Sequence, residues 1–257
     1  MHPIERLRYV ARAGVVPVAP LVRESAAALS SFADDPKGLL TSCRRLLARR
    51  SDCGPLVWLA ARMLTAMDPR AEARRVVSEL DADTTGRVLQ HGLDSLAAGS
   101  SVLAVGELGI FAAELQDRPD LRWAEPDEPE ADRLADLILI ASDCTGPSQA
   151  LVVADAVLAA EAARDRGAPV WLVAGAGRVL PGPMWDLLSA RHSPDDPPMR
   201  GLAVLDLNRL VTRVATPSGL RTPAEAARMS DCPIVPELFA PVTGHDGART
   251  GRRHIRP

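Results

Sequence analysis

The spacing of the apolar residues changes once along this chain, at the Gly-Ser-Ser sequence of residues 99–101. Before this point apolar residues recur every three or four positions, as over residues 39–47, which is the period of an amphipathic helix. After it, short runs of valine, isoleucine and leucine alternate with helical stretches, a pattern typical of βαβ units. We therefore predict a helical domain over residues 1–99 and an α/β domain over residues 100–241.

In the helical half, one segment is apolar on most of its faces. Residues 54–67 predict a central buried helix, which should end before Pro69 because the residue before a proline avoids helical backbone angles. A preceding helix is expected after Pro36, since proline is favoured in the first turn of a helix.

In the second half, strands are expected over four short apolar runs, and helices between them. The runs are continuous rather than alternating, which indicates a sheet covered on both faces, and intervening helices indicate a parallel sheet. We predict a Rossmann-like sheet with helices on both faces and a chain that returns to the sheet over residues 205–214. Residues 191–200 should form an exposed loop and residues 242–257 a disordered basic tail. The predicted strands are residues 102–105, 121–124, 137–140 and 170–173, and the predicted helices are residues 107–116 and 148–166.

Composition restricts the class of partner. The formal net charge is −3 and aromatic residues make up 3% of the chain, so nucleic acid is not expected as a partner. No apolar run approaches the roughly 20 residues of a membrane span, and the N-terminus has no signal-peptide pattern. The four cysteines form no C-x-x-C pair and no zinc-type cluster, so we expect reduced thiols in a cytoplasmic protein, no metal site and no cofactor.

Ligands of open parallel sheets bind beyond the carboxyl ends of the strands, and this rule selects three loops. The first follows the strand over residues 102–105 and contains Gly106, Glu107 and Gly109. Two glycines before a helix allow backbone N–H groups to approach an anion. Glycines also serve simple tight turns, and Glu107 would repel a phosphate.

The second loop follows the most apolar strand and is the richest in polar groups. It contains Ser142, Asp143, Cys144, Thr145 and Ser148. Its hydroxyl groups and carboxylate are expected to converge on one crevice at the start of the predicted long helix. A purely structural interpretation is a helix cap, in which a hydroxyl accepts from unpaired N–H groups and Asp143 lies favourably beside the helix dipole.

The third loop follows the strand over residues 170–173 and contains Gly175 and Arg178. The Arg178 guanidinium is a candidate anion partner because its planar fork matches phosphate oxygens, although solvated surface arginines are more common. Lys37 is the only lysine of the chain, so no lysine of the C-terminal half can clamp a phosphate or form a Schiff base.

Several segments together resemble one known family. They are the strand sequence that ends at Asp143, the Arg-Gly-Ala-Pro sequence of residues 166–169, the Gly-Pro-Leu of residues 54–56 and the Thr-Pro-Ser-Gly of residues 216–219. They resemble the alpha, beta and delta regulatory subunits of eukaryotic translation initiation factor 2B. The relatives of these subunits include methylthioribose-1-phosphate and ribose-1,5-bisphosphate isomerases. The resemblance implies a divergent member with an α/β domain like that of ribose-5-phosphate isomerase and the CoA transferases.

The resemblance also assigns a role to Asp143, and at the same time argues against catalysis. In the isomerases the aspartate at this position takes part in proton transfer. Their Asn-Lys pair is replaced here by the apolar residues 151–154, and their cysteine after the first strand is absent from the loop at Gly106. A lone carboxylate at a helix N-terminus should also stay charged, which makes it a poor general acid.

We therefore expect a non-catalytic protein that binds a small phosphorylated ligand, such as a sugar phosphate or nucleotide, or that pairs with another subunit. The family's relatives associate through their α/β halves, which predicts a homodimer. The alternative is an aldose–ketose isomerase or a transferase acting on a phosphosugar, with Asp143 as acid and base and Arg178 as anion partner. A third hypothesis, a translation initiation or nucleotide-exchange subunit, rests on the family name alone.

Overall fold

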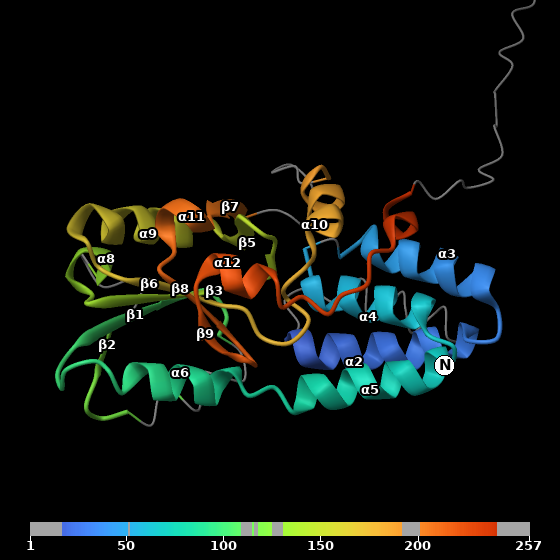
Figure 1. Ribbon diagram of the computed structural model, residues 1–257, viewed down its shortest axis with the longest axis horizontal. Helices are drawn as coiled ribbons and strands as arrows, with labels where there is room; N and C mark the ends of the chain where they lie inside the picture. Colours follow the sequence, from blue (N-terminus) through green and yellow to red (C-terminus); the bar gives the residue numbers. More distant parts are fainter. Residues whose placement is uncertain are drawn as a thin grey trace, which may run out of the picture.

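The computed structural model describes residues 17–50, 52–108, 118–124, 131–191 and 201–240, together with Leu115 (Figure 1). The predicted tail, most of the predicted exposed loop over residues 191–200 and most of the predicted helix over residues 107–116 lie outside the described residues.

The first part of the chain is helical, as predicted. Helix α4 is buried along nearly its whole length, and α2, α3 and α5 surround it (Figure 1). The side chain of Asp35 accepts from the backbone N–H of Gly38, and that of Asp68 accepts from Arg70 N–H, so each caps a helix with a proline in its first turn. The elements are α2 (Val18–Leu29), η1 (Ser30–Phe32), α3 (Pro36–Leu47), α4 (Gly54–Thr65), α5 (Pro69–Asp81) and α6 (Thr85–Leu93).

The main sheet has six strands in the order β2-β1-β3-β6-β8-β9. The first five are parallel, and β9 runs antiparallel to β8. Every residue of β3 and β6 is buried, which explains why these strands are continuously apolar. The strands are β1 (Ser101–Val105), β2 (Arg122–Ala124), β3 (Leu137–Ala141), β6 (Val170–Val173), β8 (Arg213–Thr216) and β9 (Gly219–Arg221).

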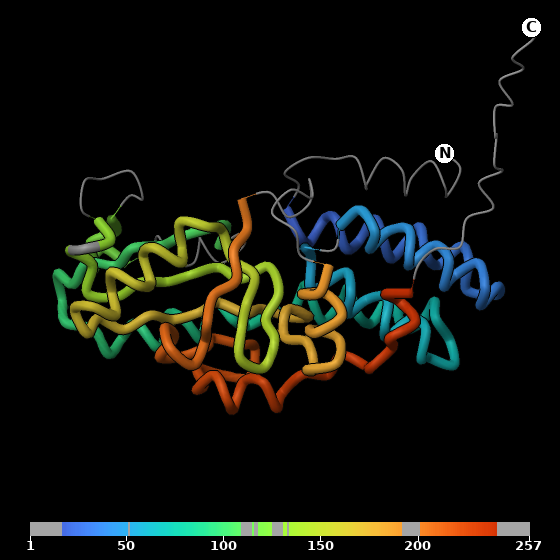
Figure 2. Tube along the Cα trace, turned by 90° about the horizontal axis from the view of Figure 1, so that it is seen from above, coloured from blue at the N-terminus to red at the C-terminus, as the bar shows by residue number. Residues whose placement is uncertain are grey.

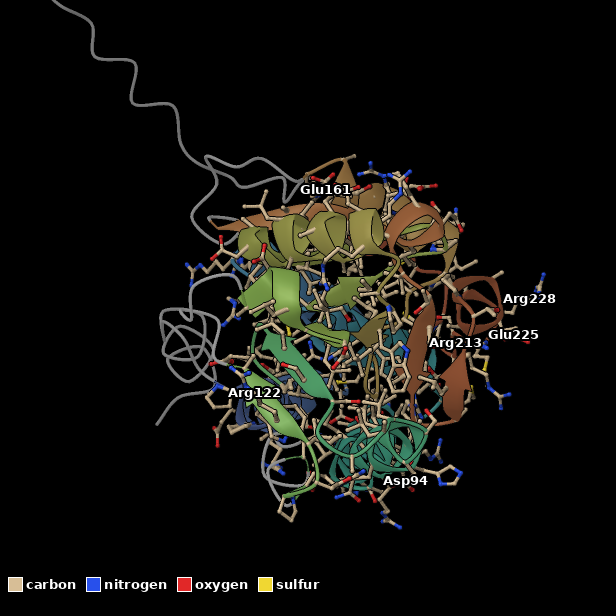
Figure 3. All side chains as sticks on the ribbon, turned by 90° about the vertical axis from the view of Figure 1, so that its left-hand side faces the viewer. Asp94, Arg122, Glu161, Arg213, Glu225 and Arg228 are labelled. Atoms are coloured by element: carbon tan, nitrogen blue, oxygen red, sulfur yellow. The ribbon has the colours of Figure 1, made fainter. Side chains whose placement is uncertain are left out.

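Helices cover both faces of this sheet, as predicted. Helices α8 (Ala131–Leu134), α9 (Ala154–Arg166) and α11 (Leu207–Leu210) lie on one face, and α6 lies on the other (Figure 1). A Glu161–Arg209 ion pair of 2.7 Å joins α9 and α11, and Figure 3 shows Glu161 on the outer side of α9. Helix α6 belongs to the predicted helical half but packs on the sheet through Leu89 and Leu93. The division of the chain at residue 99 stays a prediction.

A second, antiparallel sheet corrects the predicted long helix over residues 148–166. Residues 149–153 form a strand instead, and α9 begins only at Ala154. The segment over residues 205–214, which was predicted to return to the main sheet, is split between the two sheets. Its first residues belong to a strand of the second sheet, and its last residues belong to β8 of the main sheet. The fold is therefore not wholly parallel. The strands are β4 (Cys144–Thr145), β5 (Gln149–Val153) and β7 (Leu202–Asp206).

The β4–β5 hairpin joins the two halves of the molecule. Its Cys144 and Leu151 belong to the same apolar core as α4, together with α10 (Gly182–Ser189) and η3 (Pro236–Phe239). Figure 2 shows the last described residues running back over the helical half. At Gly146 the hairpin approaches α10 so closely that a Cβ atom would lie 2.3 Å from the Trp185 ring. Only glycine fits there without a shift of the ring or the backbone.

Candidate functional site

Asp143 lies directly after β3, between the hairpin and the helical half. Its backbone N–H donates to the Leu151 carbonyl at 2.9 Å, and its own carbonyl accepts from Gly54 N–H, the first residue of α4, at 3.0 Å. No helix begins at this loop, so the predicted placement of Asp143 at a helix N-terminus is wrong. The residue is instead clamped by two backbone hydrogen bonds.

Burial dominates the chemistry of the Asp143 carboxyl group. It raises the pKa from 3.8 to about 6 against the opposing charge of Arg178, with Asp52 and Glu107 adding to the rise and Arg50 opposing it. The expected stabilisation of the charged form is therefore reversed. A carboxyl group with a pKa near 6 exchanges protons readily at neutral pH.

Arg178 is held beside Asp143 by the backbone of the same loops. Its guanidinium Nη1 donates to the Ser142 carbonyl, its backbone N–H donates to Gly175 O at 3.1 Å, and its carbonyl accepts from Thr145 N–H at 2.8 Å. The structure thus brings together two residues that the sequence places on different loops. One donor of the Arg178 fork is thus used within the fold.

The two buried hydroxyl groups of the second loop form hydrogen bonds within the fold. Ser142 and Thr145 are buried, and their side chains form a chain in which Thr145 Oγ1 donates to Ser142 Oγ at 3.0 Å and Ser142 Oγ donates to the Val173 carbonyl at 3.0 Å. Ser148 is exposed, and its carbonyl accepts from Leu207 N–H. Neither Thr145 nor Ser148 caps a helix, because β5 follows them.

The neighbouring thiols are buried and neutral. Burial raises the pKa of the Cys53 thiol to about 12 and that of the Cys144 thiol well above its ordinary value. A thiol acts as a nucleophile or a base only as a thiolate, so both groups are inert near neutral pH. Cys144 belongs to the apolar core.

An Arg50–Asp52 pair also faces this region, although it lies outside the loops that follow the strands. Arg50 Nε and Nη2 donate to the two Asp52 carboxylate oxygens at 3.1 and 3.2 Å, and the charges of both residues reach Asp143. Arg50 Nη1 is buried and has no hydrogen-bond partner among the described residues. The sequence signal that could have identified this pair is the presence of two opposite charges just before the buried helix α4.

The other predicted contacts lie in different places. Glu107 is exposed but close enough to influence Asp143, whereas Gly106 lines a separate cavity of about 430 Å³ with Val153 and Asp155. Gly109 lies outside the described residues. Of the predicted site residues, Gly106 and Gly175 thus line two different cavities.

Gly175 lines a third region, a cavity of about 400 Å³ at the carboxyl ends of β6 and β8. Its walls are the end of α5, residues 174–177, residues 216–218 and residues 229–231, with Trp58 of α4 also contributing. Neither Asp143 nor Arg178 is among the described residues that line it. In the part of the chain that the structure describes, no three metal-ligating side chains cluster together, and no helix has the length and apolar character needed to cross a membrane.

Several solved structures share this architecture. A translation initiation factor eIF-2B from Pyrococcus horikoshii OT3 has a TM-score of 0.66 at 13% identity, over 87% of this chain and 98% of its own. A chain of the tetrameric eIF2B-beta2-delta2 complex from C. thermophilum has a TM-score of 0.64 at 14% identity, over 88% and 92%. The 5-methylthioribose 1-phosphate isomerase from Pyrococcus horikoshii OT3 has a TM-score of 0.56 at 14% identity, over 88% and 86%.

No protein-family model and no curated protein sequence matches this chain. The structural likeness nevertheless defines a class: a helical front joined to a mostly parallel α/β sheet. Its fold is that of the initiation factor 2B subunits and of 5-methylthioribose 1-phosphate isomerase. The resemblance found in the sequence motifs is confirmed at the level of the fold.

Proposed function

We propose that this chain is a non-catalytic protein of the initiation factor 2B fold that binds a small phosphorylated ligand beside Asp143 and Arg178. The observation that carries the proposal is the fixed Arg178 guanidinium next to a carboxyl group whose pKa is about 6. A guanidinium binds phosphate oxygens, and a carboxyl group forms a hydrogen bond with a sugar hydroxyl in either of its protonation states. A sugar phosphate or a nucleotide offers both partners. The four buried, free cysteines fit a reducing compartment such as the cytoplasm.

The lack of a second proton-transfer group that is both buried and unpaired supports a non-catalytic role. Aldose–ketose isomerisation requires a positioned acid and a positioned base, each worth roughly 10²–10⁴-fold in rate. Among the described neighbours of Asp143, the guanidinium groups of Arg50 and Arg178 do not release protons, and the thiols of Cys53 and Cys144 stay neutral. Of the two carboxylates near Asp143, Asp52 is engaged by Arg50, and Glu107 is exposed to solvent. Asp143 would have to act nearly alone.

One observation favours the alternative, an isomerase or transferase acting on a phosphosugar. The raised pKa of Asp143 suits a residue that donates and accepts a proton at neutral pH. In this alternative Asp143 is the acid and base, and Arg178 holds the phosphate.

A thermal-shift series with ribose 5-phosphate, ribose 1,5-bisphosphate and AMP tests the binding proposal. A ligand at 100 times its Kd should add about 2.7 kcal/mol to the free energy of unfolding, which corresponds to a rise of about 5–10 °C in Tm for a chain of this size. The rise should disappear in Arg178→Gln and persist in Arg164→Gln, which changes an exposed arginine of α9. The absence of a shift with all three compounds, or a full shift in Arg178→Gln, would contradict the proposal.

We also propose that the chain forms a homodimer. A chain of similar fold comes from a tetrameric complex, and two large apolar side chains are exposed on adjacent helices here, Leu134 of α8 at 62% and Leu158 of α9 at 64%. Sedimentation at micromolar concentration should give twice the 27.4 kDa mass of one chain. Leu158→Asp should shift the species to the monomer, and Met67→Asp, at an exposed turn far along the helical half, should not. A wild-type protein that is entirely monomeric would refute the pairing.

A further inference from the structure

We infer that the outward face of helix α3, together with the turn after it, is a docking surface for an acidic segment of another protein. This α3 surface consists of Lys37, Thr41, Arg44, Arg45 and Arg49, and Figure 1 shows α3 at the outer edge of the helical half. Residues 36–50 contain five positively charged side chains and no carboxylate. The opposite face of α3 is buried in the apolar core, so the α3 surface lies on the side of the helix away from the core.

The positive charges of the α3 surface have no acidic partner in the part of the chain that the structure describes. No ion pair there joins any of its four positive side chains to a carboxylate. The two carboxylates just before α3 are already engaged, since Asp34 binds Arg70 at 2.6 Å and Asp35 accepts from Gly38 N–H. Helix α5 shows the contrast, because its Arg70 and Arg75 each bind a carboxylate. The α3 surface therefore presents charge that the described fold does not neutralise.

The stability of the helix does not explain this arrangement. The helix dipole favours positive charges in the last turn, which accounts for Arg44 and Arg45. Lys37, however, lies in the first turn, where a positive charge is unfavourable. Arg49 continues the last turn through an N–H bond to Leu46 O at 3.1 Å and follows Arg45 by four positions, a spacing at which like charges repel. A carboxylate-bearing partner would relieve both unfavourable features.

The α3 surface is also shaped for close approach of another chain. The Nε of Arg44 donates to the Glu237 carbonyl at 2.7 Å, while its Nη1 and Nη2 form no hydrogen bond with a described residue. A guanidinium that is already held in place loses less conformational freedom when it binds a carboxylate. Thr41 lies one turn before Arg45, and Ala48 lies one turn after Arg44, so small side chains separate the cations. A partner backbone can therefore lie close to the helix.

An acidic protein segment fits these features better than a nucleic acid or a lipid surface. Helix α3 has no aromatic side chain on which a base could stack, and the whole chain has a net charge of −3. A helix that binds a lipid surface exposes large apolar side chains, and none of those exposed among the described residues lies on α3. Carboxylates match the guanidinium fork. Lys37 and Arg45 are eight residues apart, or about 12 Å along a helix, so the partner should carry several carboxylates over a similar length.

Fluorescence anisotropy of the full chain with a labelled peptide of Glu-Glu-Ala-Ala repeats, about 12 residues long, tests this inference. The peptide should bind at low salt, and its affinity should fall at least fivefold when NaCl is raised from about 50 to about 300 mM. The matched peptide with glutamine in place of glutamate should not bind. A single-stranded RNA of the same length and vesicles that contain phosphatidylserine should bind more weakly than the acidic peptide.

Two double variants locate the binding. Arg45→Gln combined with Arg49→Gln should weaken the binding of the acidic peptide at least tenfold. Arg164→Gln combined with Arg228→Gln removes two exposed arginines of the α/β half and should leave it unchanged. Arg178→Gln should leave it unchanged as well, which separates this surface from the phosphate site proposed above.

Cross-linking locates the peptide without changing the arginines. Lys37 is the only lysine of the chain, and a carbodiimide joins an amine to a carboxylate as an amide while the carbodiimide leaves as its urea. Mass spectrometry should find the acidic peptide attached to Lys37, and Lys37→Arg should lose this cross-link while it still binds the peptide. The inference is overturned if the acidic peptide does not bind, if the glutamine peptide, the RNA or the vesicles bind equally well, if the Arg45/Arg49 double variant binds normally, or if no cross-link forms at Lys37.

Discussion

Replacing Asp143 with asparagine should raise the free energy of unfolding by up to about 3 kcal/mol at pH 8, with little gain near pH 4. Burial raises the pKa of this carboxyl group from 3.8 to about 6 in the folded protein. Between these two values the folded state binds more protons than the unfolded state. Stability therefore falls as the pH rises through this window, and the asparagine side chain, which cannot ionise, escapes the loss.

Urea denaturation of wild type and Asp143→Asn at half-unit intervals from pH 4 to pH 8 measures this effect. The difference between the two proteins should grow up to about pH 6 and then level off. Asp186→Asn, an exposed change on α10, serves as the control and should stay within about 0.5 kcal/mol of wild type throughout. A constant difference across the range, or a loss of stability at pH 8, would show that burial does not control this group.

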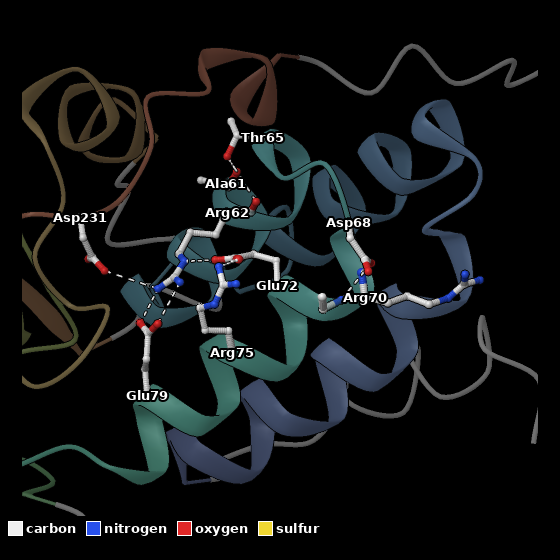
Figure 4. A network of polar contacts seen from close by, with 10 residues as sticks. Ala61, Arg62, Thr65, Asp68, Arg70, Glu72, Arg75, Glu79 and Asp231 are labelled. Carbon is white, nitrogen blue, oxygen red and sulfur yellow. Dashed lines mark hydrogen bonds and ion pairs between the residues drawn. The ribbon is translucent and has the colours of Figure 1, made fainter.

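Replacing Arg62 with alanine should destabilise the fold by about 3 kcal/mol or more. The Arg62 side chain is 12% exposed and joins α4 to Glu72 and Glu79 of α5 and to Asp231 (Figure 4). Removal of one partner of a buried ion pair leaves the other charge without compensation, and among the described residues the buried Glu72 then keeps only Arg75. The contact of the guanidinium with the Trp58 ring is lost as well.

The matched control for this change is Arg75→Ala. Arg75 binds the same Glu72, but its side chain is 63% exposed, so its removal should cost at most about 1 kcal/mol. Chemical denaturation of both variants at pH 7 gives the comparison. Equal losses in the two variants would mean that burial of the Arg62 pair contributes nothing.

The general architecture could be predicted because it depends on local patterns. Continuous apolar runs predicted β3 and β6, and the apolar run after Gly54 predicted the buried α4. Strand β5 was missed because a short apolar run such as residues 149–153 has no period that distinguishes a strand from the first turn of a helix. Its pairing with β7, about 50 residues away, decides the outcome.

The sequence predicted only those residues of the candidate site that follow strands of the main sheet. The strand-end rule placed Asp143 and Arg178 at one edge, but it selects only loops of the sheet. The Arg50–Asp52 pair reaches Asp143 from the helical half, and Asp83 reaches Ala176 across a separation of 93 residues. The raised pKa of Asp143 was missed for the same reason, since the hairpin and α4 bury the carboxyl group where a helix N-terminus was expected.

The central proposal is that this protein has the initiation factor 2B fold but does not catalyse the isomerisation of sugar phosphates. A direct assay of turnover tests it. Purified protein is incubated with 5-methylthioribose 1-phosphate or with ribose 1,5-bisphosphate, and conversion to the ketose is followed by NMR. We predict no conversion above the protein-free control, because, of the two other carboxylates near Asp143, one is bound by Arg50 and the other, Glu107, is exposed. Conversion of either sugar, abolished in an Asp143→Asn variant that remains folded, would contradict it.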